Sequence, residues 1–318
     1  DSSPTHSYCR FLYKYPQHAF PYMQLIQQNQ RDRLSPEFEL LDTGIFNDNR
    51  YFDCYIEYAK AGVSDILMKI TVFNRGPEKA TIHVLPHIWF RNFWKHNIRF
   101  SKPAITSVTD KCIKTTSSRN GNFYFYHEGG EQLFCENETN NERMYHRTRE
   151  GTKAAVWLKA DIAPGKSRTF RVRLSAAMLD NPWNDFEEDI AKRIKDTNEY
   201  YDQLASSKKL SKSQHKLLRG AVSGLLWTKQ FYYLDVYKWI FGEPNETAPH
   251  RHYKRNYDWQ HLTCRNIISM PDKWEYPWFA AWDLAFHAAS FIHIDPYFAK
   301  QQLLLVLREY YMHPNGQI

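Results

Sequence analysis

The spacing of apolar residues changes near residue 180, and this change limits what the chain can fold into. Between Ile66 and Val72 the apolar side chains stand at every second position, which is the period of a β-strand. Similar short runs, separated by turn residues, recur from about residue 37 to 176. We expect strands over residues 51–58, 65–74, 79–90, 123–127, 153–160 and 168–175. Many short strands are typical of an antiparallel sandwich, and the lack of βαβ alternation disfavours a Rossmann-type sheet.

Beyond residue 180 the apolar residues recur at helical spacing. Asn181-Pro182-Trp183 resembles a helix entrance, and an acidic first turn follows it. We expect helices over residues 183–206, 211–241, 277–292 and 296–312, and a loop over residues 242–262. About four helices are too few to close a helical barrel. We therefore expect the C-terminal part to expose apolar surface, and we expect the chain to be a fragment.

The charge balance disfavours nucleic acid as the main partner. The chain has 42 Lys and Arg against 35 Asp and Glu, a net charge of +7. The basic clusters are short, however, such as Lys208-Lys209 and residues 250–255. Nucleic-acid binders concentrate positive charge in a patch, because neutralising phosphates drives their affinity. A nucleic-acid role is therefore the weakest of three hypotheses.

Five cysteines, an odd number without any C-x-x-C pair, disfavour a disulfide framework and a zinc ribbon. A reducing compartment fits better, and we expect a cytoplasmic location. No apolar run approaches the roughly 18 residues that a membrane span needs. Two sequons, at Asn137 and Asn245, would accept glycans only in a secreted chain. The abrupt start at Asp1 carries no signal peptide, and we expect the true start to be missing.

The segment of residues 267–288 is the most unusual in the chain, because Trp259, Trp274, Trp278 and Trp282 gather in and near it. If a helix begins at Pro277, Phe279, Asp283 and His287 share one face. A carboxylic acid surrounded by aromatic rings keeps its proton near neutral pH, because burial disfavours the charged form. Glycoside hydrolysis requires such an acid, while aromatic faces hold the sugar. The residues alone favour another interpretation, in which the tryptophans are core and Asp283 pairs with Arg or Lys.

A family resemblance changes that weighting. The run from Met270 to His287 ends in Trp-Asp-Leu-Ala-Phe-His and resembles the W-D-x-x-F-H element of glycoside hydrolase family 63 and its relatives. The resemblance covers nearly the whole chain and is to an uncharacterised branch of this group. Further blocks that look like this branch are residues 4–8, 38–44, 89–92, 136–140, 226–233 and 311–317.

The resemblance implies an N-terminal antiparallel β-sandwich over residues 1–178, a linker helix region over 179–212, and the first helices of an (α/α)6 barrel over 213–318. Members of the family invert the anomeric carbon and act on α-glucosides, including the terminal glucose of N-glycan precursors, or on mannosylglycerate and glucosylglycerate. An oligosaccharide or small glycoside is therefore the expected partner.

The resemblance also implies roles for single residues. Asp283 matches the family's general acid. The family's base, a Glu, lies downstream of this chain, so the fragment alone is expected to be inactive. The stretch between Asn140 and Gly151 is shorter than the family pattern. The expected substrate contacts are Trp274, Tyr276, Trp278, Trp282, Phe286, His287 and Gln317.

Other chemistry is less well supported by the sequence. Glu275 and Asp272 are possible second carboxylates, but two catalytic carboxylates must flank the bond from opposite sides. The histidine pairs His83/His87 and His250/His252 lack a third ligand, so no metal site is expected. No nucleotide-binding motif occurs, and no cofactor is expected. The second hypothesis is a non-catalytic carbohydrate-binding or scaffold protein on the same fold.

Overall fold

The structure is a computed structural model that describes residues 1–92, 94, 101–137, 149–206, 210–242, 256–273, 275–276, 278–308 and 311–318. The chain divides into two compact units. One unit comprises Cys9–Asn92 and Ser101–Arg193, and the other comprises Asp1–Tyr8, Phe93–Phe100 and Ile194–Ile318. We call them the sandwich unit and the helical unit.

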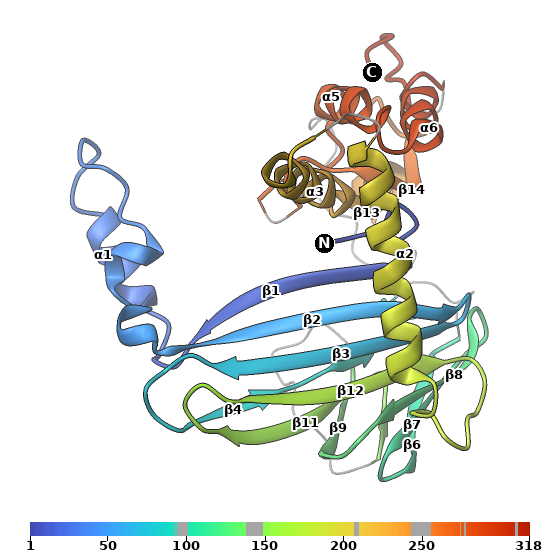
Figure 1. The fold of residues 1–318 in the computed structure, drawn as a ribbon. Coiled ribbons are helices and arrows are strands. Elements are labelled where there is room, and N and C mark those ends of the chain that lie inside the picture. Colours follow the sequence, from blue (N-terminus) through green and yellow to red (C-terminus); the bar gives the residue numbers. More distant parts are fainter. Residues whose placement is uncertain are drawn as a thin grey trace. The chain divides into compact units, whose positions relative to one another are not determined.

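The sandwich unit is built from two antiparallel sheets (Figure 1). The larger has the order β1-β2-β3-β12-β8-β7-β6-β10, and in the smaller β11 is flanked by β4, β5 and β9. The strands of the larger sheet are β1 (Tyr8–Pro16), β2 (Tyr51–Gly62), β3 (Asp65–Asn74), β6 (Ala104–Thr109), β7 (Cys112–Ser117), β8 (Gly121–His127), β10 (Glu150–Gly151) and β12 (Ser167–Ser175). Those of the smaller sheet are β4 (Ala80–Val84), β5 (His87–Trp89), β9 (Glu131–Cys135) and β11 (Lys153–Ile162).

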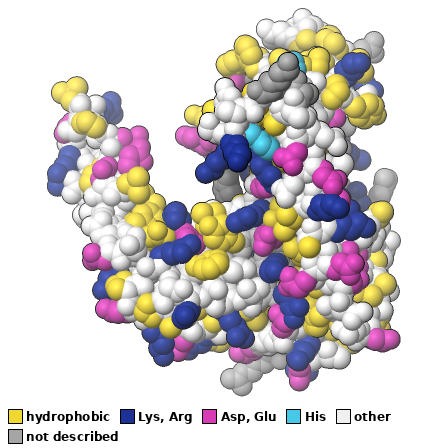
Figure 2. Space-filling view, viewed as in Figure 1, with side chains coloured by type: hydrophobic (Ala, Val, Ile, Leu, Met, Phe, Trp, Pro, Cys, Tyr) yellow, Lys and Arg dark blue, Asp and Glu magenta, His cyan; other side chains and the backbone are white. Residues whose placement is uncertain are grey.

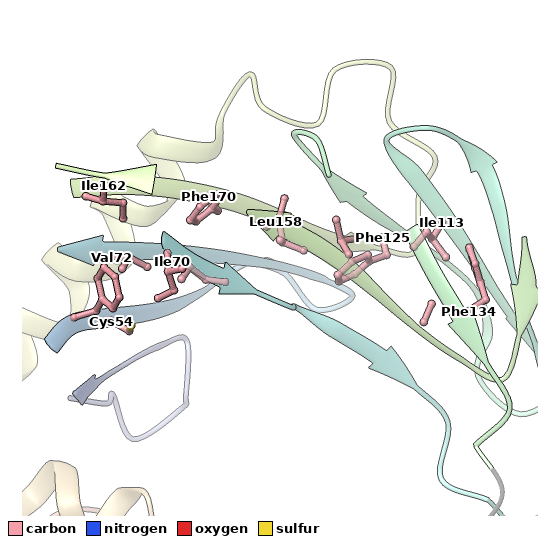
Figure 3. Close-up of a cluster of buried hydrophobic side chains, with 14 of the residues drawn as sticks. Cys54, Ile70, Val72, Ile113, Phe125, Phe134, Leu158, Ile162 and Phe170 are labelled. Carbon is pink, nitrogen blue, oxygen red and sulfur yellow. The ribbon is translucent and has the colours of Figure 1, made fainter. Parts of the chain in front are cut away.

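The core of the sandwich lies between these sheets (Figure 3). Val72 of the larger sheet and Val156 of the smaller are both fully buried, since the period of two sends alternate side chains inward. The expected antiparallel β-rich fold is confirmed, together with several helices. The larger sheet also carries α1 (Tyr22–Asn29), which has no buried residue, on the connection from β1 to β2.

The sequence pattern missed some strands and misplaced others. The single strand expected over residues 79–90 is two strands, β4 and β5, separated at Pro86, which cannot donate a ladder hydrogen bond. Both strands nevertheless keep one register on β11, and Val156 N donates to Pro86 O at 3.1 Å. Five strands of the sandwich unit were not predicted: β1, β6, β7, β9 and β10.

The helical unit mixes helices with one small sheet. It contains the end of α2 (Phe186–Ser206), followed by α3 (Lys212–Leu226), α4 (Val236–Phe241), α5 (Ala281–Phe291) and α6 (Pro296–Val306). Strands β13 (Lys229–Asp235) and β14 (Thr263–Ser269) pair antiparallel over seven residue pairs. The expected helix over 211–241 is therefore wrong beyond Leu226. The run Phe231-Tyr232-Tyr233 has the aromatic composition that strands favour, and β14 supplies its partner.

The first residues of the chain belong to the helical unit rather than to the sandwich. Arg219 Nη2 lies 2.6 Å from an Asp1 carboxylate oxygen, and Trp227 Nε1 donates to Asp1 O at 3.1 Å. The buried Tyr201 hydroxyl donates to Ser2 O at 2.8 Å. These contacts hold the start of the chain, Asp1 and Ser2, against α2 and the C-terminal end of α3.

Other features bear on the environment of the chain. All five cysteines are free, and four are buried. Burial raises the pKa of Cys54 and of Cys264 to about 11, which leaves both as unreactive thiols. In the described part of the chain no helix is long and apolar enough to cross a membrane. Figure 2 shows basic and acidic side chains interspersed over the visible face.

Several features that the sequence analysis named lie outside the described residues. These include Thr139, the sequon at Asn245, Lys208-Lys209, the pair His250/His252 and residues 141–148 of the short stretch. Asn137 is described, and its Nδ2, the atom that would carry a glycan, donates to Phe90 O at 2.7 Å.

The corner between β11 and β12 depends on one buried side chain, that of Asn74 at the end of β3. Asn74 Nδ2 donates to Ile162 O at 2.8 Å and to Glu78 O at 2.7 Å. Its Oδ1 accepts from Gly76 N at 2.8 Å and from Gln17 Nε2 at 2.7 Å. All four hydrogen-bonding positions of the amide are thus filled.

We predict that Asn74→Ala lowers the free energy of unfolding by about 2–4 kcal/mol, because it leaves buried backbone groups without partners. Asn122→Ala, at an exposed position of β8, should change it by less than about 0.5 kcal/mol. Urea unfolding monitored by circular dichroism measures both. Equal stability of the two variants would show that the corner does not depend on this amide.

Candidate functional site

Helix α5 carries Asp283, and it begins later than the sequence suggested. The helix starts at Ala281 with Ala280 as its N-cap, so Phe279 precedes the helix and does not share a face with Asp283. Phe279 instead packs edge-on against Tyr311, with ring centroids 5.3 Å apart. Pro277, the expected first residue, lies outside the described residues. Asp283 falls in the first turn, where the helix dipole favours an acidic side chain.

Asp283 is half-buried in the structure. Among the described residues no Lys or Arg lies within ion-pair distance of its carboxylate. The alternative in which Asp283 is held by a structural cation therefore gains no support. Its carboxylate acts on His287, one turn further along α5, by raising the pKa of that imidazole against the effect of burial.

His287 is held by a chain of hydroxyl groups that the sequence did not reveal. Ser269, the last residue of β14, places Oγ 2.5 Å from His287 Nδ1. The same Oγ lies 2.7 Å from Thr228 Oγ1, which donates to Leu225 O at 2.6 Å. Gln302 of α6 fixes the backbone of this strand end by accepting from Ser269 N at 3.1 Å and donating to Ile267 O at 3.0 Å.

Counting protons along this chain assigns the tautomer of His287. Thr228 gives its one hydroxyl proton to Leu225 O, so Ser269 must donate to Thr228. Ser269 then has no proton left for His287, and His287 Nδ1 must be the donor. In the neutral ring Nε2 is consequently an acceptor, and no described residue bonds to it.

This arrangement excludes a serine nucleophile. The Ser269 side chain is buried, with 2% of the residue exposed, and its hydroxyl already serves two partners. A substrate carbonyl therefore cannot reach it, and Ser269 is better understood as the group that orients the His287 ring.

The aromatic residues around Asp283 are exposed rather than enclosing. Trp282 is 71% exposed and Phe286 67%, and their rings meet edge-on with centroids 5.8 Å apart. Trp278 and Tyr276 form a second edge-on pair at 5.1 Å, and both are about half exposed. Trp282 and Phe286 thus offer flat apolar faces on the helix that carries the acid, and the described residues leave Asp283 only half-buried.

Two predicted contacts remain, Trp274 and Gln317. Trp274 lies outside the described residues. Gln317 is exposed, and within the described part of the chain its hydrogen bonds stay in the C-terminal turn, from Asn315 Nδ2 to Oε1 at 3.1 Å and from His313 N to its carbonyl at 2.8 Å. Glu275 is exposed, and its amide donates to Asp272 Oδ1 at 3.2 Å.

Fold and site together define a class: an antiparallel β-sandwich with a helical unit that carries an acid, a histidine and exposed aromatic rings on one short helix. No family model matches the chain. A curated relative is the uncharacterized protein YMR196W of Saccharomyces cerevisiae, 33% identical over 397 aligned positions. The match covers 100% of this chain and 36% of the yeast protein, so the chain spans about a third of the relative's length.

Three solved structures share weak likeness with parts of the chain. A polysaccharide lyase has a TM-score of 0.30 at 16% identity, covering 51% of this chain and 24% of its own. A putative kojibiose phosphorylase from the human microbiome has a TM-score of 0.27 at 7% identity, covering 56% and 22%. A galactose mutarotase related enzyme from Lactobacillus acidophilus has a TM-score of 0.28 at 8% identity, covering 54% and 69%. TM-scores of this size do not establish a shared fold.

The pKa of His287 provides a test of this site. Burial lowers that pKa below its ordinary value, and the nearby Asp283 carboxylate opposes the fall. The unfolded chain therefore binds more protons, and the contribution of His287 to stability is lost as the pH falls below the unfolded value of about 6.5.

We predict that Asp283→Asn lowers the pKa of His287 further, since it removes the charge that stabilises the imidazolium. Asp258→Asn, an exposed carboxylate outside this cluster, should leave that pKa unchanged. Titration by NMR of the ring nitrogens measures the pKa and also shows whether Nδ1 carries the proton. A neutral ring protonated at Nε2 would contradict the hydroxyl chain.

Proposed function

We propose that this chain is part of a carbohydrate-active enzyme, a glycosidase of the family 63 type that hydrolyses an α-glycosidic bond with inversion. The observation that carries the proposal is the placement of Asp283 in the first turn of α5, with His287 one turn away and exposed Trp282 and Phe286 on the same helix. The six residues Trp282–His287 are those that match the family's W-D-x-x-F-H element.

Asp283 is the proposed general acid, which protonates the departing glycosidic oxygen. It does not need to be buried in the free protein. A sugar stacked on Trp282 and Phe286 displaces water from the neighbouring carboxyl group, and this desolvation favours the protonated form that an acid catalyst requires. The exposed rings are therefore compatible with the role, because the substrate itself completes the apolar surroundings.

The base is a Glu outside this chain, which draws a proton from the attacking water. In the complete protein the two carboxyl groups should stand about 6.5–9.5 Å apart, which leaves room for that water. We further propose that residues 213–318 form the first part of an (α/α)6 barrel after the linker region 179–212, that the substrate is an α-glucoside or a glycosylglycerate, and that the protein works in the cytoplasm.

Asp283→Asn in the complete protein should reduce turnover by roughly 10²–10⁴-fold, the usual contribution of general acid catalysis. Two carboxylate variants serve as controls. Glu275→Gln, an exposed rival, and Asp258→Asn should each stay within about threefold of wild type. The assay is release of free sugar from a panel of α-glucosides and glycosylglycerates. Turnover by Asp283→Asn near the wild-type rate would refute the assignment.

A second candidate is a carbohydrate-binding protein without hydrolysis. The observation that favours it is the exposure of two aromatic pairs, since rings can stack on sugars whether or not an acid is active.

Trp282→Ala should weaken sugar binding by about tenfold or more under either candidate, because it removes a stacking face. Tyr297→Ala, an aromatic residue of α6 that is 74% exposed, is the matched control and should bind like wild type. Calorimetric titration of the complete protein with the same panel measures both. Sugar binding without any turnover, lost in Trp282→Ala, would select the binding protein over the enzyme.

A further inference from the structure

A groove opens in the sandwich unit where strand β8 leaves the larger sheet. β8 pairs with β12 only from Tyr124 to His127, opposite Val172–Ser175. The chain then turns at Glu128–Gly130 and continues as β9, which pairs with β11 of the smaller sheet. The half of β12 from Ser167 to Arg171 therefore has β3 on one side, and on the other side no strand of the described residues. The resulting groove has a volume of about 730 Å³.

The turn that forms one wall of the groove is built tightly. Gly130 has a φ of +98°, and a Cβ there would come within 2.7 Å of Trp157 O on β11. The buried His127 donates from Nδ1 to Gly129 O at 2.8 Å, and Gln132 Nε2 donates to His127 Nε2 at 2.9 Å. These contacts fix where the chain changes sheet, so the groove is a defined part of the fold.

Backbone groups of β12 face into this groove. Asn74 N donates to Lys166 O, which fixes the alternation of hydrogen-bonded pairs between β3 and β12. By that alternation the N–H and C=O groups of Thr169 and Arg171 point away from β3. Arg171 N donates to Glu128 Oε2 at 3.2 Å, whereas no described residue bonds the corresponding groups of Thr169. One amide and one carbonyl therefore remain available to a ligand.

The charges in the groove are partly paired. Lys69 Nζ lies 2.6 Å from Glu187 Oε2, and Arg171 Nη2 lies 2.5 Å from Glu128 Oε1. Two further cations line the groove, Lys159 of β11 and Arg168 of β12, and both are exposed. Neither makes an ion pair with any described residue; Asp161, two positions from Lys159, is engaged by Thr81 and Lys79. The lining thus carries two positive charges in excess.

We propose that this groove binds a small anionic sugar derivative, whose phosphate or carboxylate is held by Arg168 and Lys159. Its volume falls within the roughly 300–1,000 Å³ of small-molecule sites. The Thr169 amide and carbonyl and the Glu128 carboxylate supply donors and acceptors for hydroxyl groups. The open edge offers too few backbone groups for an added peptide strand, since Glu128 already occupies the amide of Arg171.

Calorimetric titration of the complete protein with glucose 6-phosphate, glucuronate and glucose tests the proposal. Both anions should bind, or one of them, which then identifies the preferred group, and glucose should bind at least about tenfold more weakly. Arg168→Gln should weaken anion binding by about tenfold or more, and added salt should weaken it in the wild type. Lys166→Gln, on the same hairpin but outside the groove, should bind like wild type.

Absence of binding by both anions, equal binding of glucose, or unchanged anion affinity in Arg168→Gln would each overturn the proposal. The side chain of Arg168 makes no hydrogen bond or ion pair with any described residue, so its replacement should leave the thermal unfolding temperature unchanged, and a folded variant is expected. The groove and α5 use different residues, so failure here leaves the role of Asp283 untouched, and the reverse also holds.

Discussion

The sandwich depends on how the chain passes from one sheet to the other, and the amide of Asn74 controls one such passage. β11 belongs to the smaller sheet and β12 to the larger, and only a short turn joins them. At this corner Asn74 bonds Ile162 through its side chain and Lys166 and Gly165 through its backbone. Removing this buried amide is costly, because its partners would be left in the interior without a hydrogen bond to protein or to water.

Another passage between the sheets, from β8 to β9, is built differently. There the chain turns at two glycines, and the strand that would complete the edge of β12 is replaced by the side chain of Glu128. A carboxylate accepts a hydrogen bond from Arg171 N where a carbonyl would otherwise do so. The corner between β11 and β12 is thus closed by an amide, whereas the turn from β8 to β9 leaves a polar groove beside β12. The closed corner and the groove both arise where the chain passes between the two sheets.

The sequence predicted the sheet far better than the helical unit, for physical reasons. β2, β3, β11 and β12 were recognised because alternation records which side chains face the core. The segment Lys229–Asp235 was read as helix because Leu225, Leu226 and Lys229 continue the helical spacing. Only its pairing with β14, whose partner residues lie 28 to 40 positions further along the chain, makes it a strand, and no local pattern contains that information.

The candidate site shows the same division between local and distant information. The sequence singled out Asp283, His287 and their aromatic neighbours, since composition and motif are local properties. It did not reveal Ser269, a small polar residue at the end of an unpredicted strand. It also could not give exposure, and expected the tryptophans to bury the acid, whereas Trp282 is 71% exposed.

That exposure gives Asp283 and His287 different dependences on a ligand. The His287 ring is held through Nδ1 by buried hydroxyl groups, so its orientation and tautomer are set by the fold alone. Asp283 has no described cation beside it, and its open aromatic neighbours leave water in contact with the carboxyl group. Covering those rings removes the water from Asp283 while the partners of His287 Nδ1 stay in place. A flat apolar molecule on Trp282 and Phe286 would therefore change the proton affinity of the acid through desolvation, with no movement of α5 required.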